Sequence, residues 1–442
     1  MKTLFKNIVS GILIWESKIV LRKYKPRIVT VTGSVGKTSA KDAIHTVLAT
    51  KYKARKSLKS LNSEIGVPLT ILGLENAYLN PVLWIKNIVE GMMLIVFPFK
   101  YPEMLVLEVG ADRPGDIESF SKWLKPDIAV ITRFGDVPVH VEFFPSIEDL
   151  VNEKGYLVRE LKNGGTFVLN SDDKRIVDFS ESVVHPGTHT IKKISYGFNP
   201  PADVEASHEI VTYGAYAHTD LEFPNGMMTV INVRGTKVPV AIHGSLGVQH
   251  IYPVLSAFAV GIAEGMKPIE ISQALENHVP PRSRMRLIAG IKDTVLIDDT
   301  YNSSPVAVEA ALLTLKAVNV AGRKIAVLGD MMELGQYSVD EHKKAGKIVA
   351  GIAHILVTVG VRSRMTAEAA LNEGVSENNI LQFDSAQEAG KYLESVIKAG
   401  DIILVKGSQS MRMERIVEEL MNNPEEKDTL LVRQEPQWLA KK

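Results

Sequence analysis

The sequence of 442 residues contains no cysteine. Without cysteine the chain can form neither a disulfide bond nor a zinc–thiolate site, and it cannot use a thiol as a catalytic nucleophile. This composition suits the reducing cytoplasm, where disulfides do not persist. We therefore expect a cytoplasmic protein.

The sequence also lacks any excess of charge of one sign. It has 51 Lys and Arg and 51 Asp and Glu, so the formal net charge is zero. A chain without a net positive field has no general attraction for nucleic acid, and we predict no nucleic-acid partner. The sequence also shows no internal repeat and no low-complexity tract.

Long uninterrupted apolar runs are missing as well. Residues 1–24 carry too many charges for a membrane span and predict an amphipathic helix. Residues 79–99 are more apolar, but Lys86, Asn87 and Glu90 interrupt them. For residues 79–99 three alternatives stay open: docking onto the protein or a partner, peripheral contact with a membrane, and a complete span. We therefore expect residues 1–24 and 79–99 to contact either a protein partner or the periphery of a membrane.

A phosphate-binding loop is the strongest motif present. Ile28 to Thr32 is β-branched throughout, as in a buried parallel strand, and apolar residues recur at helical spacing from Ala40 to Leu48. Between them lie Gly33, Ser34, Val35, Gly36, Lys37 and Thr38, a shortened form of the usual loop. In this context we expect Lys37 to reach the outer phosphates of a nucleotide and the Thr38 hydroxyl to bind its magnesium ion.

A carboxylate stands at the end of the next apolar strand. Met104 to Gly110 is apolar except for Glu108, and the carboxyl ends of parallel strands are where such sheets bind ligands. A buried carboxylate without a partner is costly, so Glu108 should face a cation or a donor. The turn-rich segment that begins at Asn62 is suited to lining the same site.

Two further residues are ambiguous on local pattern alone. His140 ends a loop after the strand at residues 127–132, and Lys154 lies in a helix that begins near Ser146. A single His is more often structural than functional, and most helical lysines are solvated. Taken in isolation, these two residues carry no assignment.

Strand and helix patterns alternate along most of the chain, which predicts an α/β fold. We predict an N-terminal amphipathic helix at 1–26, a central nucleotide-binding domain of parallel or mixed sheet at 27–286, and a Rossmann-like α/β domain at 287–442. Residues 190–245 read as β-rich, with Asn225-Gly226 as a hairpin turn. Pro280 to Arg284 is the expected hinge, and the charged segment from Asn422 is expected to be loosely attached.

Several motifs taken together resemble the Mur ligase family, especially its branch that adds D-alanyl-D-alanine to a UDP-muramoyl tripeptide. They occur in the family's order from about Ile28 to Leu420. They are the loop at 33–38, Leu107-Glu108-Val109-Gly110-Ala111, Asp298-Asp299-Thr300-Tyr301-Asn302, Leu328-Gly329-Asp330-Met331-Met332-Glu333-Leu334-Gly335 and Val405-Lys406-Gly407-Ser408.

The resemblance implies a role for each matching residue. The loop, Arg284, Asp299 and Asn302 would bind ATP, and Thr38 and Glu108 would bind magnesium. His140 would be a ligand of a second metal ion, together with Lys154 carbamylated on its side chain. Asn62, Lys406 and Ser408 would contact substrate, and Lys37, Glu108, His140 and Lys154 form the implied catalytic set.

The implied reaction is amide-bond formation through an acyl phosphate. ATP would phosphorylate the carboxylate of an acceptor, and an amino acid or dipeptide would then displace phosphate. Lys37 and Mg²⁺ would neutralise the charge of the transferring phosphoryl group, and a cation at a second site, held by His140 and Lys154, would orient the acceptor carboxylate against it. The expected partners are therefore small molecules, and the expected pathway is peptidoglycan synthesis.

The sequence departs from the family pattern at three places. Only 32 residues precede Gly33 in this sequence, so we expect no counterpart of the family's UDP-sugar-binding domain. Gln249-His250 replaces the usual residues near the adenine, and Gln409 stands where Arg is usual. The alternatives are a ligase of another cell-surface or poly-amino-acid polymer, a P-loop kinase or ATPase, and a non-catalytic protein on a ligase fold.

Overall fold

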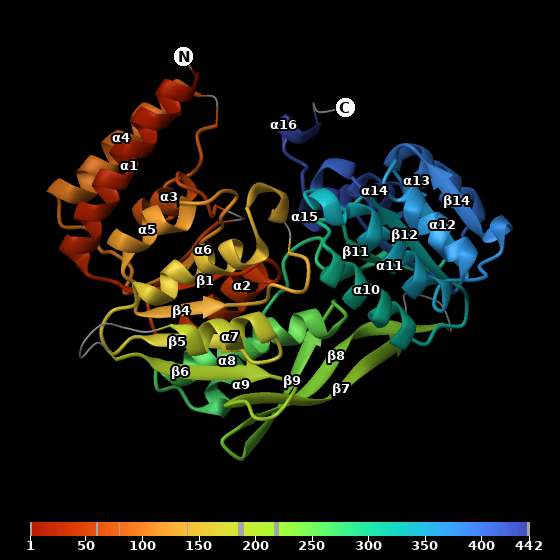
Figure 1. Cartoon of the computed structure of the whole chain (residues 1–442), viewed down its shortest axis with the longest axis horizontal. Coiled ribbons are helices and arrows are strands. Elements are labelled where there is room, and N and C mark those ends of the chain that lie inside the picture. Colours follow the sequence, from red (N-terminus) through yellow and green to blue (C-terminus); the bar gives the residue numbers. More distant parts are fainter. Residues whose placement is uncertain are drawn as a thin grey trace.

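The computed structural model describes residues 2–58, 61–78, 80–138, 140–183, 190–215 and 221–439. Two sheets form its framework (Figure 1). The first has nine strands in the order β2-β3-β1-β4-β5-β6-β7-β8-β9, and the second has six in the order β10-β11-β15-β12-β13-β14. This arrangement confirms the predicted α/β fold class.

The first sheet and its helices use the chain up to residue 275. The strands are β1 (Arg27–Thr32), β2 (Ala54–Lys56), β3 (Met104–Glu108), β4 (Ile128–Ile131), β5 (Thr166–Asn170), β6 (Lys192–Gly197), β7 (Val204–Ala215), β8 (Glu222–Val233) and β9 (Thr236–His243). The helices are α1 (Lys2–Tyr24), α2 (Lys37–Leu48), α3 (Gly66–Leu72), α4 (Pro81–Val96), α5 (Asp116–Leu124), α6 (Ile147–Arg159), α7 (Lys174–Ser182), α8 (Ile251–Ala263) and α9 (Pro268–Leu275), with short 3-10 turns η1 (Val141–Phe143) and η2 (Val248–His250).

The second sheet and its helices use the rest of the chain. The strands are β10 (Arg286–Gly290), β11 (Thr294–Asp299), β12 (Lys324–Gly329), β13 (Ile355–Val359), β14 (Ile380–Phe383) and β15 (Ile402–Lys406). The helices are α10 (Pro305–Ala317), α11 (Ser338–Ala350), α12 (Arg364–Asn372), α13 (Ala386–Val396), α14 (Glu414–Leu420), α15 (Lys427–Leu430) and α16 (Pro436–Leu439), with the 3-10 turn η3 (Gly335–Tyr337). The predicted boundary at residues 286–287 stays a proposal.

The apolar β1 strand is explained by helices on both faces of the sheet. Val29 and Val31 belong to the core that contains α2 and α8, whereas Ile28 belongs to the opposite core with α1, α3 and α5. Strands β3 and β4 flank β1 in parallel. Because successive side chains alternate between two buried faces, a central strand needs apolar residues at nearly every position.

Parallel pairing brings the candidate site residues to one edge of each sheet. Strands β1, β3 and β4 end at Thr32, Glu108 and Ile131, and β11 and β15 of the second sheet end at Asp299 and Lys406. The loops that follow parallel strands share one edge, which is where open α/β sheets bind ligands.

The predicted hairpin turn at Asn225-Gly226 is wrong. Both residues lie within β8, opposite a register irregularity of β7 at Thr212 and Tyr213. Gly226 is required there by close packing, since a Cβ at this position would lie 2.3 Å from the Ile242 carbonyl oxygen of β9. The turn between β8 and β9 lies instead at Arg234-Gly235, where both residues have positive φ (48° and 86°), as a type I′ turn needs.

The expectation of a loosely attached C-terminal segment is also wrong. Leu431 is fully buried in the core of the second sheet and Arg433 is 6% exposed. The guanidinium of Arg433 donates to Glu414 Oε2 (3.0 Å) and to the Thr300 carbonyl oxygen (3.1 Å). The high charge of this segment misled the interpretation, because one Arg is used in a buried ion pair.

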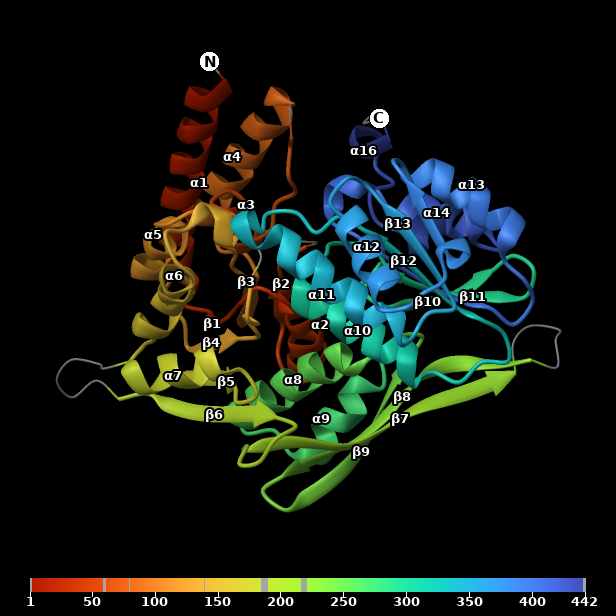
Figure 2. The same cartoon turned by 45° about the vertical axis from the view of Figure 1, so that its right-hand side comes forward.

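Where an amphipathic helix is predicted at residues 1–26 the structure has helix α1, and the predicted apolar segment contains α4. The two helices lie side by side and project from the body of the protein (Figures 1 and 2). Leu79, the first residue of the predicted apolar segment, lies outside the described residues. Among the residues that the structure describes, none of the helices is both long and apolar enough to cross a membrane.

Candidate active site

The loop from Gly33 to Thr38 closes β1 and opens α2, as predicted. Gly33 has φ 139°, and a Cβ there would lie 2.2 Å from Thr132 Oγ1, so only glycine fits. Gly36 has φ 84° and directly precedes α2. The loop therefore presents backbone N–H groups at the start of a helix, which is a favourable place for phosphate.

The Lys37 side chain folds back over this loop. Its Nζ donates to the carbonyl oxygens of Gly33 (2.9 Å) and Ser34 (3.3 Å). Burial lowers the pKa of Lys37; Glu108 opposes this effect, and the positive charge of Arg284 adds to it. Arg284 lies just before β10 of the second sheet, so a charge from beside the second sheet also acts on the loop.

The Glu108 carboxylate is buried, and only one of its two oxygens accepts a hydrogen bond from a described residue. Asn62 Nδ2 donates to its Oε1 at 3.1 Å, whereas Oε2 has no hydrogen-bond partner among the described residues. The ammonium of Lys41, 1% exposed, lies 3.7 Å from Oε2. An orphaned buried carboxylate oxygen beside a phosphate loop fits a divalent cation. Sequence reasoning missed Lys41, although it follows Lys37 by one helical turn.

His140 joins the two halves of the molecule. Its Nδ1 lies 2.8 Å from Oε2 of Glu333, which follows β12 in the second sheet, and its Nε2 lies 3.9 Å from Asp112 Oδ1. His140 lowers the pKa of the Glu333 carboxyl. Asp112 and Glu333 were not among the predicted site residues, although Glu333 lies within the motif at Leu328–Gly335 and Asp112 directly follows the motif that ends at Ala111.

Lys154 is a buried amine beside a second lysine. It is 1% exposed in α6, and burial together with the nearby charge of Lys37 lowers its pKa to about 7. The preceding residue, Glu153, accepts hydrogen bonds from the N–H groups of Ile117 (2.6 Å) and Glu118 (3.1 Å) at the start of α5. This contact fixes α6 against α5 and so holds Lys154 in place.

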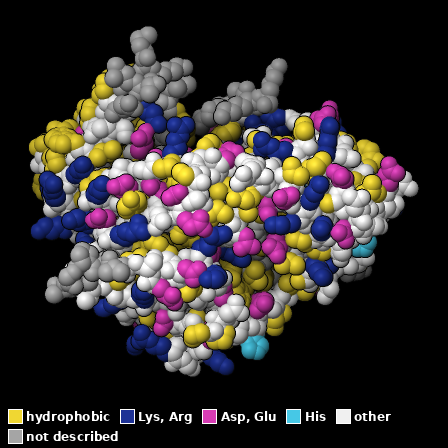
Figure 3. All heavy atoms as spheres, in the orientation of Figure 1, with side chains coloured by type: hydrophobic (Ala, Val, Ile, Leu, Met, Phe, Trp, Pro, Cys, Tyr) yellow, Lys and Arg dark blue, Asp and Glu magenta, His cyan; other side chains and the backbone are white. Residues whose placement is uncertain are grey.

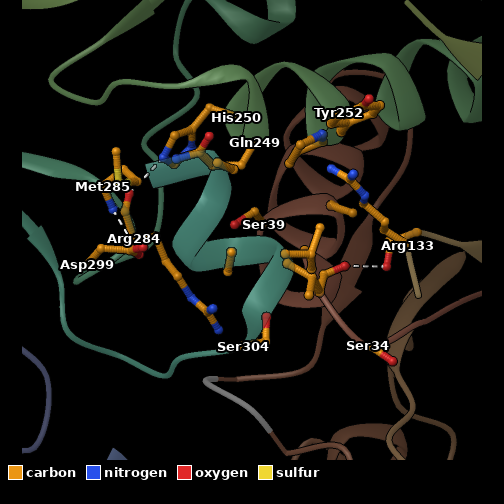
Figure 4. Close-up of a pocket in the computed structure, with 18 of the residues that line it drawn as sticks. Ser34, Ser39, Arg133, Gln249, His250, Tyr252, Arg284, Met285, Asp299 and Ser304 are labelled. Carbon is orange, nitrogen blue, oxygen red and sulfur yellow. Dashed lines mark hydrogen bonds between the residues drawn. The ribbon is translucent and has the colours of Figure 1, made fainter. Parts of the chain in front are cut away.

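Residues of both sheets line one cavity next to the phosphate loop (Figure 4). The predicted nucleotide residues that line it are Ser34, Val35, Gly36, Arg284, Asp299 and Asn302, and they are joined by Lys406. Figure 4 shows Gln249 and Tyr252 on one side of the cavity and Ser34 and Ser304 on the other. The sequence predicted these nucleotide-binding residues one by one, and the structure places them around a single cavity between the two sheets.

The lining of this cavity contains several unsatisfied polar atoms. Among the described residues, hydrogen-bond partners are lacking for both side-chain polar atoms of Gln249, for Arg284 Nε and for the hydroxyls of Ser34, Ser303 and Ser304. Buried polar groups in folded proteins are almost always paired. Such a concentration of unpaired groups is typical of a site for a polar ligand.

The far wall of the cavity is held by one buried ion pair. Lys406 Nζ donates to Asp299 Oδ2 (2.6 Å) and to the Asn302 carbonyl oxygen (3.0 Å). The guanidinium of Arg284 stacks on Tyr301 at 4.0 Å from the ring centroid. Lys406 therefore positions the Asp299–Asn302 loop as well as facing the cavity.

A second cavity adjoins the first and includes the C-terminal segment. Thr38 and Arg284 line it on the loop side, and Trp438 and Arg433 line it on the tail side. Arg282 and Gln409 are among the other lining residues that come from the second half of the chain. Five Lys and Arg and three Asp and Glu line this cavity next to Thr38, and this small positive excess suits an acidic substrate.

Ser408 lines neither of these two cavities. Its Oγ accepts from the Met332 N–H (2.9 Å), and its own N–H donates to the Asp330 carbonyl oxygen (3.0 Å). It therefore holds the loop that carries Glu333, and its predicted substrate contact stays a prediction.

Metal ligation likewise stays a prediction. Among the residues the structure describes, groups of three or more His, Asp or Glu side chains in a metal-binding arrangement do not occur. The predicted sets include the Thr38 hydroxyl and a modified Lys154, which are ligands of other types. The observation that supports a cation at this site is that Glu108 Oε2 is buried and has no hydrogen-bond partner among the described residues.

Two family descriptions match this chain. Residues 31–261 match the Mur ligase middle domain, and residues 283–409 match the Mur ligase, glutamate ligase domain. Together they cover the phosphate loop, Glu108, His140, Lys154 and the Asp299 and Lys406 pair.

Individual proteins of the same kind are similar to this chain over most of its length. The UDP-N-acetylmuramoyl-tripeptide--D-alanyl-D-alanine ligase of Bacillus subtilis (strain 168) is 27% identical over 418 residues, which are 92% of this chain and 79% of that ligase. The fold is similar to MurF ligase from Thermotoga maritima in complex with ADP, with a TM-score of 0.73, 22% identity and coverage of 95% and 84%. It is also similar to MurF from Acinetobacter baumannii, with a TM-score of 0.72, 23% identity and coverage of 92% and 79%.

Proposed function

The chain belongs to the Mur ligase family of ATP-dependent, carbon–nitrogen bond-forming ligases, and on this premise we propose that it joins D-alanyl-D-alanine to the carboxylate of a muramoyl peptide. The observation that carries the proposal is the shared cavity, which is lined by the phosphate loop after β1, by Arg284 and by Asp299 and Lys406 of the second sheet. The choice of both substrates is supported by the relative from Bacillus subtilis, which is a UDP-N-acetylmuramoyl-tripeptide--D-alanyl-D-alanine ligase. The basic second cavity beside Thr38 supports an acidic acceptor.

The reaction places negative charge where this chain supplies positive charge. The γ-phosphoryl group passes from ATP to the acceptor carboxylate, which gives ADP and an acyl phosphate; the amine then displaces phosphate and loses a proton. The backbone N–H groups of the 33–38 loop bind phosphate, and Lys37 and Arg284 offset the charge that develops. Thr38 and Glu108 would hold Mg²⁺, which supplies Lewis-acid stabilisation of the phosphoryl oxygens.

Lys154 is suited to carbamylation because its amine is partly neutral. An ordinary Lys is almost wholly protonated at pH 7, whereas a pKa of about 7 leaves about half of the side chain neutral. The neutral amine adds to CO₂ and releases a proton, and the product is a carbamate anion. We propose that this anion, with His140 and its neighbour Asp112, holds a second cation at the acceptor carboxylate.

Gln249 is our candidate for recognition of adenine. Its amide offers a donor and an acceptor in the cavity, both without partners among the described residues. A Gln amide can pair with the donor and acceptor of an adenine edge at once. Replacing Gln249 by Leu should raise the KM for ATP about tenfold or more, with a smaller effect on kcat, because one or two hydrogen bonds to the base are lost.

The measurement is initial-rate kinetics with ATP and GTP. Gln409→Leu is the matched control, since Gln409 lines the second cavity and not the first. An unchanged KM for ATP in Gln249→Leu, or an equal rise in Gln409→Leu, would contradict this assignment.

The proposed reaction is tested by asking whether conversion of ATP to ADP depends on the presence of both substrates. Purified full-length protein is mixed with ATP, Mg²⁺, D-alanyl-D-alanine and a muramoyl tripeptide, and the products are identified by mass spectrometry. We expect an amide whose mass is the sum of both substrates minus water, and ADP in equal amount only when both are present. ADP release at the full rate without the dipeptide would identify an ATPase or kinase instead, and amide formation only with other amines or acceptors would identify a ligase of another polymer.

A further prediction concerns surface contacts outside the cavities. We propose that residues 1–24 and 80–99 contact a membrane or a partner, since neither helix contributes a residue to the two cavities described above.

A further inference from the structure

We propose that α4, together with the exposed side of α1, docks this protein onto the surface of a lipid bilayer that contains anionic lipids. The docking surface is a stripe along α4 that we call the α4 stripe. It consists of Val82, Ile85, Val89, Met92 and Val96.

The α4 stripe is both apolar and open to solvent. Its five side chains are 70%, 64%, 52%, 38% and 63% exposed. Their spacing of three, four, three and four residues places them on one face of the helix. An apolar helix face normally points into a core, so this orientation needs a different explanation.

Packing on the opposite face of α4 forces the stripe outward. Trp84, Asn87 and Gly91 are buried, and Gly91 lies so close to α1 that a Cβ would meet Glu16 Oε2 at 2.2 Å. At the base of the pair, Lys23 Nζ of α1 donates to the Leu94 carbonyl oxygen of α4 at 3.0 Å. The helices thus run parallel in close contact, and α4 cannot turn its stripe inward.

The apolar exposure is concentrated at this place. Of the 24 strongly exposed large apolar side chains among the described residues, nine lie between residues 82 and 99. Ile8 and Trp15 of α1 add two more, at 54% and 51% exposure. Soluble monomers seldom show contiguous apolar patches of this kind unless the patch binds something.

Charge and aromatic residues favour an anionic bilayer over a second copy of the chain. Residues 1–27 and 80–103 together hold nine Lys and Arg but three Glu, although the whole chain is neutral. Two copies would bring like charges together, whereas anionic lipid attracts them. Exposed Trp15, Phe97 and Phe99 suit the boundary between head groups and acyl chains. Figure 3 shows hydrophobic side chains, with Lys and Arg among them, where Figure 1 places α1 and α4.

The geometry indicates contact from one side. At about 1.5 Å per residue, the α4 stripe runs for roughly 20 Å along the helix, and the other face of the helix is covered by protein. An amphipathic helix of this kind buries its apolar face about 5–10 Å into the membrane interface without crossing it.

The test is flotation of the full-length protein with vesicles of phosphatidylglycerol mixed into phosphatidylcholine, and with phosphatidylcholine vesicles alone. We expect binding to the anionic vesicles that falls at least about tenfold with phosphatidylcholine alone or at high salt. The double substitution Val89→Glu and Met92→Glu should weaken binding at least about tenfold. Because both residues are solvent-exposed, this variant should keep its thermal unfolding midpoint and its ligase rate in solution.

Ile269→Glu is the matched control, since Ile269 is 51% exposed on α9, away from the stripe, and it should bind like the wild type. Trp15 should shift its fluorescence to shorter wavelength on binding, and Trp15→Phe should remove that shift. Absent vesicle binding, or equal binding by the stripe variant, would overturn the proposal. A third outcome would also overturn the proposal: the wild type does not bind vesicles but forms a dimer in analytical ultracentrifugation, and the stripe variant abolishes that dimer.

Discussion

Replacing Lys37 by Ala is expected to reduce amide formation by at least about a thousandfold, while the fold stays intact. The Lys37 ammonium lies on the phosphate loop, bonded to the Gly33 and Ser34 carbonyl oxygens, and its charge is held where the phosphoryl group transfers. Loss of that charge raises the barrier of the first chemical step. The measurement is single-turnover production of ADP and of amide with both substrates present.

Glu108→Gln should have a loss of similar size through the proposed magnesium site. Gln keeps the shape of the side chain and can still accept from Asn62, but it cannot neutralise a cation. The loss should be accompanied by a higher Mg²⁺ requirement. Lys174→Ala, an exposed lysine of α7, is the control and should be unchanged. A rate within tenfold of wild type in Lys37→Ala or Glu108→Gln, with circular dichroism as in the wild type, would remove these residues from the mechanism.

Lys154→Ala is expected to lower the ligation rate about a hundredfold or more, because the proposed carbamate and the cation it holds are both lost. A small carboxylate such as acetate should restore part of the rate in this variant by refilling the cation site. Lys154→Arg cannot form a carbamate and leaves no space, so acetate should not rescue it.

The same proposal predicts a dependence on pH and CO₂. The neutral fraction of Lys154 rises as pH increases through its pKa of about 7, so in CO₂-limited buffer the rate should rise over this range and increase further when bicarbonate is added. Bicarbonate enriched in carbon-13 should give a carbamate signal in the wild type that Lys154→Ala lacks. Full activity in CO₂-free buffer without that signal would contradict carbamylation.

Consecutive residues gave the most reliable predictions from sequence. The β1 strand, the loop at 33–38 and the start of α2 follow one another in the chain, so strand propensity, glycine and helix period all act locally. Glu108 was visible for a similar reason, as one carboxylate in an otherwise apolar strand. These features depend on a few neighbouring residues, and a single sequence contains that information.

Local pattern was least reliable where another strand or a distant charge decides the structure. Asn225-Gly226 carries a turn signal, yet close packing against β9 keeps it within β8. The segment from Asn422 was predicted to be loosely attached because it is highly charged. The structure shows that Arg433 of this segment is buried because it pairs with Glu414.

What the sequence determined by itself is therefore the α/β alternation, the phosphate loop and its lysine, and the carboxylate at the end of β3. Only the tertiary structure decided that His140 meets Glu333, that Lys154 lies beside Lys37 with a pKa near 7, and that the α4 stripe faces solvent. The physical reason is the separation along the chain of the residues that interact. Hydrophobic period and backbone propensity act over neighbouring residues, whereas burial, charge pairing and exposure depend on elements that the chain brings together from far apart.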